Sequence, residues 1–119
     1  MADDQTPSLG DTFPAMREAS SAYLGAIDSL PSPDRRTHEL IRLACSVILR
    51  HPGAIERHAM LAAEFGATWA DVVGTLVLTE PGFGLIPARD AMAHARSGFQ
   101  RGLAALGTDD ADLDEPELP

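Results

Sequence analysis

The chain has 119 residues, of which 45 % are hydrophobic and 5 % aromatic, and 18 acidic residues against 9 basic ones give a formal net charge of −9. This length allows one domain with a modest core, and the scarcity of aromatic residues favours packed helices over a β-sandwich. The chain has no lysine, a single cysteine and no long apolar run, which excludes Schiff-base chemistry on lysine, an internal disulfide and a membrane-spanning helix.

The negative charge is concentrated at the two ends of the chain. Residues 1–11 contain three acidic residues and residues 108–119 contain six, with no basic residue in either segment. We therefore expect a flexible acidic segment at 1–11, a helical domain at 12–107 and a disordered acidic tail at 108–119. The body between them is electrically balanced and has no basic stripe, so neither nucleic acid nor a membrane is expected as a partner. The first residues lack the pattern of a signal peptide, and we expect a cytoplasmic protein.

Apolar residues repeat at helical spacing through the first half of the chain. Thr12 and Pro14 predict the start of a helix that ends at the LPSP sequence, because proline cannot continue a helix. One face of this helix is apolar: Met16, Ala19, Tyr23, Ile27 and Leu30. A second helix is predicted from Ser32, its N-cap, as far as the HPG sequence at 51–53. Its main apolar stripe consists of Leu40, Ile41, Ala44, Val47 and Ile48.

Three more helices are predicted further along. One covers residues 52–65 and is closed by Gly66, and the next begins after Thr68, which forms a capping-box pattern with Asp71. The apolar face of that helix consists of Trp69, Val72, Val73 and Leu76. Residues 80–87 are predicted to form a loop, and Pro87 opens the last helix, which Gly107 closes. Its inward face consists of Ala91, Met92, Ala95, Phe99, Leu103 and Leu106. These patterns predict an all-α bundle of five to six helices that gains further burial by forming oligomers.

Two histidines, His51 and His58, lie seven residues apart around the start of the third predicted helix. His58 shares its direction with the buried face that Ile55 and Ala59 define, and seven residues are nearly two turns, so His51 would point the same way. Near a helix start, unpaired backbone N–H groups favour a neutral imidazole, which is a competent general base. The alternatives are a buried His58 bonded to a backbone carbonyl and an exposed His51 in a turn.

Glu39 lies opposite the apolar stripe of its helix, on a side shared with several arginines, Arg35 among them. This position predicts a surface carboxylate with arginine partners three or four residues away. His38 and His94 are expected to be exposed. Cys45 is expected to fill space beside the core, because neither a helix start nor a neighbouring cation activates its thiol.

Over about residues 33–92, which include HELIRLACSVILRHPGAIERHAMLAAEFGATWADVVGTLVLTEPGFGLIPARDAM, the chain resembles the carboxymuconolactone decarboxylase family, which also contains the alkylhydroperoxidase D proteins. The most specific part of the resemblance runs from His51 through GAT to the FGLIPA sequence. It implies an all-helical fold of the carboxymuconolactone decarboxylase and alkylhydroperoxidase D type. It further implies a homotrimer or homohexamer with active sites near subunit contacts.

The peroxidase branch of this family carries a Glu followed by Cys-x-x-Cys-x-x-x-His. When the last His of that pattern is placed on His58, the Glu corresponds to Glu39, and the two cysteines fall on His51 and Ala54. Without these thiols the chain has no nucleophile for a peroxide and no disulfide to cycle, so thiol peroxidase activity is disfavoured.

The decarboxylase branch implies a lyase or isomerase that transfers protons on a small unsaturated carboxylic acid or lactone, with no cofactor and no metal. The resemblance suggests Glu39, His51 and His58 as the catalytic group. Loss of carbon dioxide would leave a dienolate that a histidine protonates at carbon, and Glu39 would orient the histidine or, if buried at a subunit contact, hold a proton through a raised pKa. Arg42 is the expected binding residue for a substrate carboxylate, from its position alone.

Two other functions remain open at this point. One is a non-catalytic helical oligomer of the same fold that acts as a binding or assembly protein. The other is a metal site, since two histidines and a carboxylate match the composition of a facial triad, although their spacing is not a local metal motif.

Overall fold

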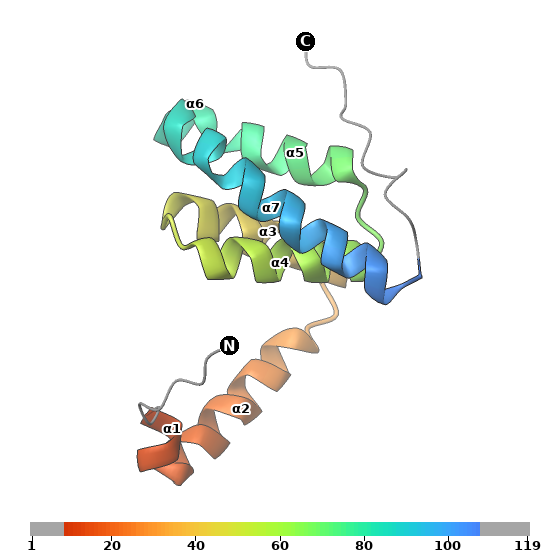
Figure 1. The fold of residues 1–119 in the computed structure, drawn as a ribbon. Helices are drawn as coiled ribbons and strands as arrows, with labels where there is room; N and C mark the ends of the chain where they lie inside the picture. The colour runs from red at the N-terminus through yellow and green to blue at the C-terminus, as the bar shows by residue number, and fades with distance from the viewer. Residues whose placement is uncertain (1–8, 108–119) are drawn as a thin grey trace. The chain divides into compact units, whose positions relative to one another are not determined.

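The computed structural model describes residues 9–107, and all the secondary structure in this range is helical (Figure 1). The helices are α1 (Leu9–Thr12), α2 (Pro14–Asp28), α3 (Arg35–Ile48), α4 (Pro52–Glu64), α5 (Trp69–Leu78), α6 (Glu80–Phe83) and α7 (Leu85–Ala105). The chain divides into two units, residues 1–32 with α1 and α2, and residues 33–119 with α3 to α7. The all-α prediction is confirmed. The predicted acidic tail at 108–119 and most of the segment 1–11 lie outside the described residues, and the boundaries at 12 and 107 stay predictions.

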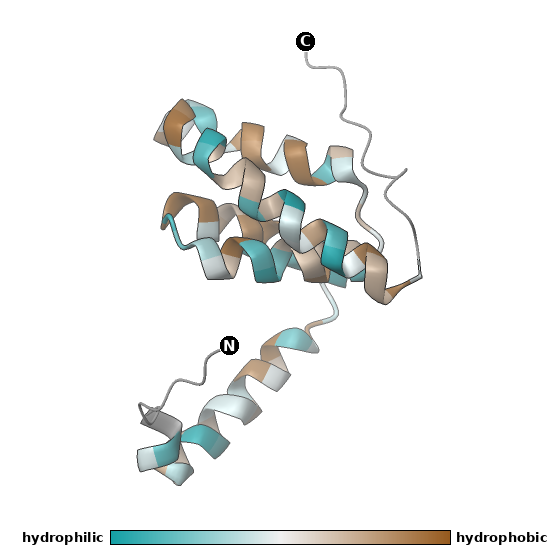
Figure 2. Cartoon of the chain, viewed as in Figure 1, coloured by the Kyte–Doolittle hydropathy of each residue, from teal (hydrophilic) through white to brown (hydrophobic). Residues whose placement is uncertain are grey.

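Helix α2 presents its apolar face to solvent. The helix starts with Pro14 at its first position and Phe13, rather than the predicted Thr12, at the N-cap. No residue of α2 is buried, and Met16 and Tyr23 are 58 % and 68 % exposed. Figure 2 shows hydrophobic and hydrophilic residues interspersed along this helix. The repeat of apolar residues therefore predicted the helix but not a buried face.

Helix α3 begins two residues later than predicted and is rotated relative to the predicted stripe. Asp34, not Ser32, caps it, and the Asp34 carboxylate accepts a hydrogen bond of 2.8 Å from the Thr37 backbone N–H. The side that faces the core carries Leu43 and Val47, whereas Ile41 of the predicted stripe is 52 % exposed. The sequence has apolar residues around much of this helix, so periodicity alone did not determine which side the other helices cover.

Helices α4 and α7 make the closest contact of the second unit, which Figure 1 shows as two ribbons lying against each other. Two glycines of α7 allow this approach. A Cβ atom on Gly98 would overlap the backbone carbonyl of Glu56, and one on Gly102 would lie 2.7 Å from the Ala63 Cβ. Because α4 carries His58, this contact also positions the helix on which the candidate site depends.

Helices α5 and α7 complete the core. The Trp69 ring packs against the Phe99 ring with a centroid distance of 5.5 Å and an angle of 53° between the ring planes. The predicted capping box is confirmed, since the Thr68 hydroxyl accepts from the Asp71 N–H and the Asp71 carboxylate accepts from the Thr68 N–H. The largest fully buried side chains are those of Trp69, Phe99, Leu43, Leu76, Glu39, Val47 and Val72. A carboxylate is therefore among the largest core residues.

The predicted loop at residues 80–87 is wrong, because α6 forms there and α7 already begins at Leu85. Proline is compatible with the first turn of a helix, where its missing N–H has no partner to lose, so Pro81 and Pro87 do not prevent either helix. Leu106, expected to face inward, follows the end of α7 and is 55 % exposed. Among the described residues no helix is long and apolar enough to cross a membrane.

Candidate functional site

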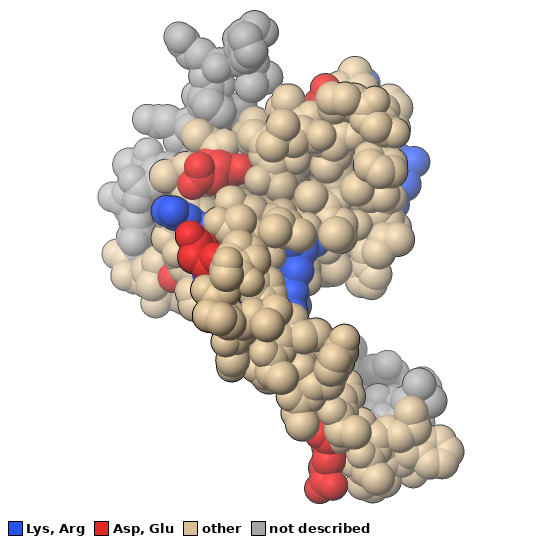
Figure 3. Space-filling model, turned by 180° about the vertical axis from the view of Figure 1, so that it is seen from behind, with Lys and Arg blue, Asp and Glu red and all other residues tan. Residues whose placement is uncertain are grey.

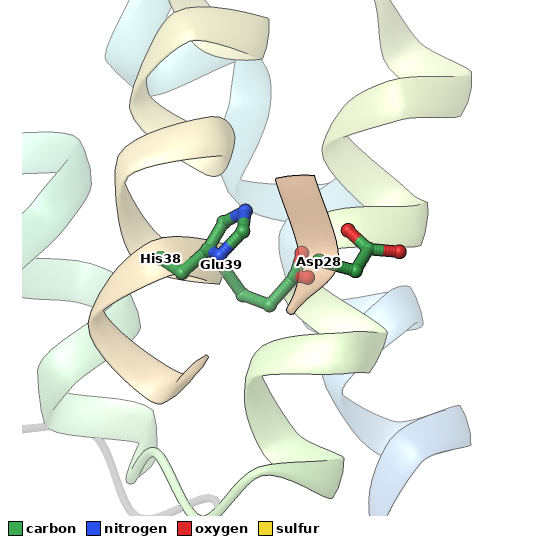
Figure 4. A group of neighbouring side chains, drawn as sticks. All are labelled: Asp28, His38 and Glu39. Atoms are coloured by element: carbon green, nitrogen blue, oxygen red, sulfur yellow. The ribbon is translucent and has the colours of Figure 1, made fainter. Parts of the chain in front are cut away.

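Glu39 on α3 and His58 on α4 form a hydrogen bond across two neighbouring helices. The His58 Nδ1 atom lies 2.8 Å from the Glu39 Oε1 atom. The Glu39 side chain is fully buried, and 17 % of the His58 side chain is exposed. Figure 4 shows the Glu39 side chain extending away from the α3 ribbon. The prediction that His58 points inward thus agrees with the structure, but its partner is a carboxylate rather than a backbone carbonyl.

Two arginines of α3 interact with the other oxygen of the same carboxylate. Arg35 approaches Glu39 Oε2 with Nε at 2.9 Å and Nη2 at 2.5 Å. Arg42 Nη1 lies 3.8 Å from that oxygen, within ion-pair distance but beyond a hydrogen bond. The expected arginine pairs of Glu39 are present, but they surround a buried carboxylate, so the prediction of a surface group is wrong. Spacing of three and four residues was the signal for these pairs, and it says nothing about burial.

Glu39 is held in its ionised form. Burial raises the pKa of this carboxyl group, but the hydrogen bonds from His58 and Arg35, together with the positive charges of these two groups, outweigh burial and lower the pKa from 4.5 to about 2. Of the two roles expected for Glu39, this lowered pKa contradicts holding a proton and agrees with orienting the histidine. The two hydrogen-bonding neighbours explain the difference, since each of them stabilises the carboxylate more than the acid.

An ionised Glu39 determines which nitrogen of His58 carries a proton. A carboxylate can only accept hydrogen bonds, so Nδ1 of His58 must be the donor in the 2.8 Å contact. In the neutral ring Nε2 then has a free lone pair, and in the protonated ring Nε2 carries a proton that can be given away. The pair can therefore orient a histidine for acid–base chemistry at Nε2.

His51 lies at the start of α4, as expected, but the structure does not join it to the Glu39–His58 pair. It is the N-cap residue, with an extended backbone, and its Nδ1 atom accepts a hydrogen bond of 3.0 Å from the Ala54 N–H. The His51 residue as a whole is exposed. Because Pro52 begins the helix and His51 precedes it, the helical phase that would align His51 with His58 does not extend back to this residue. Seven residues of helix also separate the two positions by roughly 10 Å along the axis.

The remaining candidates differ from expectation in two cases. His94 is exposed, as predicted, whereas His38 is buried with 8 % exposure. Cys45 is exposed and does not fill space beside the core. Both His38 and Cys45 lie on α3, so the same misplacement of its buried side explains both errors.

Comparison with known protein families identifies the chain. Residues 14–97 match the carboxymuconolactone decarboxylase family, a range that begins at α2, includes α3 to α6 and reaches into α7. Searches of curated proteins and of solved structures gave no match to the chain. The match covers well over half of the chain and includes the helices that carry Glu39 and His58. By its sequence and its all-helical fold, this chain belongs to the carboxymuconolactone decarboxylase family.

Proposed function

We propose that this protein is a cofactor-independent lyase or isomerase of the carboxymuconolactone decarboxylase type, which acts on a small unsaturated carboxylic acid or lactone. The observation that carries the proposal is the hydrogen bond between Glu39 and His58, with an ionised carboxylate on the buried side and a partly exposed ring on the other. Since only the ring is exposed, His58 is the member of the pair that meets a substrate.

The proposed reaction balances with these groups alone. The bond between carbon and the substrate carboxylate breaks, carbon dioxide leaves, and the electron pair remains on the conjugated system as a dienolate. Protonated His58 donates its Nε2 proton to carbon and forms the new C–H bond, and the neutral ring regains a proton from water. Glu39 stabilises the protonated ring before the transfer and keeps it oriented afterwards.

We propose Arg42 as the residue that binds a carboxylate of the substrate. Its Nη1 atom lies 3.8 Å from the Glu39 carboxylate, next to the Glu39–His58 pair, and 26 % of its side chain is exposed. A guanidinium group can hold a carboxylate through two parallel hydrogen bonds, which would orient the substrate relative to the neighbouring pair.

The second candidate function is a non-catalytic oligomer that binds or assembles. It is favoured by an open apolar groove of about 350 Å³ on the second unit, formed by α3, α5 and α6 and lined by nine residues without a charged side chain. Ile41 and Leu78 in this groove are 52 % and 80 % exposed. Figure 3 shows the molecule from behind, where charged side chains are sparse among large uncharged areas.

The apolar groove also supports a homo-oligomer, for which we propose a trimer or a hexamer. Exposed hydrophobic surface of this kind is typical of contacts between subunits. Such an assembly is compatible with both candidate functions, so the oligomeric state does not distinguish them.

A metal-dependent reaction at Glu39 is a weaker alternative on chemical grounds. One oxygen of this carboxylate accepts from His58 and the other accepts from Arg35, so a metal ion would compete with these donors for the carboxylate.

The experiment that separates the candidates is a screen of unsaturated acids and lactones. Release of carbon dioxide and loss of the conjugated absorbance would be followed for the wild type, His58→Ala and Glu39→Gln, with His94→Ala as the matched histidine control. We expect activity on at least one substrate, retained in His94→Ala and lost in the other two variants while they remain folded. Equal activity in all four proteins would overturn the lyase proposal.

A further inference from the structure

We propose that Arg35 is a positioning residue, seated on the Phe65 ring, that binds one oxygen of Glu39 and thereby directs the other to His58 Nδ1. Because each oxygen of the Glu39 carboxylate then has its own partner, this arrangement fixes the tautomer of the His58 ring. The catalytic consequence rests on the proposed function, whereas the effect on the ring is a property of the protein without substrate.

The contacts of Glu39 are divided between its two oxygens. Both contacting nitrogens of Arg35 lie on Oε2, at 2.9 and 2.5 Å, and His58 lies on Oε1 at 2.8 Å. A guanidinium group has a rigid planar set of donors, so two of its nitrogens on one oxygen fix the position of Oε2. Oε1 is then left to accept from the His58 ring.

The Arg35 side chain is itself held in place by an aromatic residue at the C-terminal end of α4. Its guanidinium carbon lies 4.5 Å from the centre of the Phe65 ring, and Phe65 is the C-cap residue of α4. An arginine stacks on an aromatic face as a plane, which restricts its otherwise mobile side chain. The contact therefore links the first turn of α3, where Arg35 lies, to the end of the helix that carries His58.

Loss of Arg35 would change which atoms of the Glu39–His58 pair carry protons, and not only the strength of their hydrogen bond. A fully buried carboxylate with fewer cationic donors favours its protonated form, because burial penalises the charge. A protonated Glu39 would donate to His58 Nδ1, and the ring proton would then move to Nε2. The neutral ring would then carry its proton on Nε2, without the positive charge that makes this nitrogen a proton donor in the proposed reaction.

Arg36 provides a matched control for this inference. It follows Arg35 directly in α3 and has the same charge, but its side chain is exposed, and the described contacts to Glu39 come from Arg35, Arg42 and His58. Replacement of Arg36 therefore removes an equal charge from the same turn without removing a ligand of the carboxylate.

The test is nitrogen NMR of the full chain labelled at its histidine rings, without substrate, with His58→Gln used to assign the His58 signals. In the wild type and in Arg36→Gln we expect the proton of the neutral ring on Nδ1 and the lone-pair resonance on Nε2. In Arg35→Gln the lone-pair resonance should move toward Nδ1, and Arg35→Lys should restore the wild-type state only in part. Phe65→Leu, which keeps Arg35 but removes the aromatic face, should give an intermediate shift, and it serves as the test if Arg35→Gln does not fold.

A His58 tautomer that is unchanged in Arg35→Gln, or in Phe65→Leu if the first variant is unfolded, would overturn the inference. Where a substrate is found, kcat of Arg35→Gln should fall at least about tenfold with little change in KM, since a proton-transfer group is disturbed and substrate binding is not. If the tautomer shifts as expected but the wild type has no turnover on any acid or lactone, the positioning role stands and the proposed function fails.

Discussion

Glu39 and His58, which are nineteen residues apart in the sequence, are joined by a hydrogen bond of 2.8 Å between adjacent helices. The carboxylate has no exposed surface, and the ring keeps a small exposed part. This combination gives the ring a fixed orientation and a constant negative neighbour while leaving one nitrogen accessible.

Removal of the carboxylate should destabilise the fold. In Glu39→Ala the buried ends of His58 and Arg35 lose their shared partner, and we expect the free energy of unfolding to fall by about 3 kcal/mol, typical of breaking one side of a buried ion pair. Urea denaturation followed by circular dichroism measures this change. Glu64→Ala, on the same helix as His58, is the control and should lower stability by less than about 1 kcal/mol. Similar losses in the two variants would show that Glu39 is not a structural ion-pair partner.

Acid should weaken the fold through Glu39 in a defined pH range. Its pKa is about 2 in the folded chain against an ordinary 4.5, so the unfolded chain binds the proton more readily. The stabilisation is complete above about pH 5 and is lost as the pH falls toward 2, with a total on the order of 3 kcal/mol. Asp34, whose pKa is lowered by the hydrogen bond from the Thr37 backbone, contributes in the same direction.

The measurement for this acid effect is urea denaturation of the wild type and of Glu39→Gln between pH 6 and pH 3. Because Gln does not titrate, the difference in stability between the two proteins should shrink as the pH decreases. A difference that stays constant over this range would mean that the pKa of Glu39 is not lowered in the folded chain.

The contact between α4 and α7 should tolerate no side chain at its centre. A methyl group on Gly98 would overlap the Glu56 carbonyl, so Gly98→Ala is expected to destabilise the protein by about 2 kcal/mol. Gly74 in α5 has free space at the same position, and Gly74→Ala should be neutral or slightly stabilising, since alanine favours a helix. Thermal denaturation measures the melting temperatures of both variants, and we expect that of Gly98→Ala to be lower. Equal melting temperatures would contradict the close packing of α4 against α7.

His51 should act through the helix start rather than through the reaction. In His51→Ala the cap of α4 is lost, and we expect a loss of about 1 kcal/mol in stability, whereas His51→Asn supplies another capping acceptor and should recover most of it. Under the proposed function, His51→Asn should also retain most of the wild-type turnover. An Asn variant that is as stable as the wild type but inactive would instead place His51 in the catalytic group, as the sequence suggested.

The apolar groove should be covered in solution by a second copy of the chain. Leu78→Glu places a charge at a residue that is 80 % exposed in the single chain, so it should reduce the oligomer to smaller species without unfolding them. Light scattering coupled to size-exclusion chromatography measures the mass, and Arg57→Glu, at an exposed position of α4, is the control. A wild-type chain that runs as a monomer would refute the proposed assembly.

Local signals predicted two helix C-terminal ends and one N-cap, whereas the predicted N-caps Thr12 and Ser32 were wrong. Gly66 and Gly107 adopt the positive φ angles, 96° and 77°, that a helix C-terminus favours, and the Thr68 cap is present. These features depend on a few adjacent residues, so the sequence contains the necessary information. The missed helix α6 shows the limit of this approach, since the Pro and Gly residues that suggested a loop are also compatible with a short helix.

The candidate site was predictable only in part. Helical phase on α4 was enough to predict the inward direction of His58, because the apolar residues of that helix lie on one side. The burial of Glu39 was not predictable from its helix, because a charged residue beside several arginines is typical of a surface. The family resemblance, which aligned Glu39 with a functional position, was the signal that pointed to it. Only the packing of α3 against α4 shows why a carboxylate is retained inside the core.

The most direct measurement of the central claim is turnover in deuterium oxide, with the product analysed by mass spectrometry and NMR. For a substrate that the wild type decarboxylates, we predict one solvent-derived deuterium on carbon in each product molecule, because the proton donated by His58 exchanges with water. In folded His58→Gln, product formation should fall by a factor of about 100 or more. Decarboxylation at the wild-type rate in His58→Gln would contradict the account.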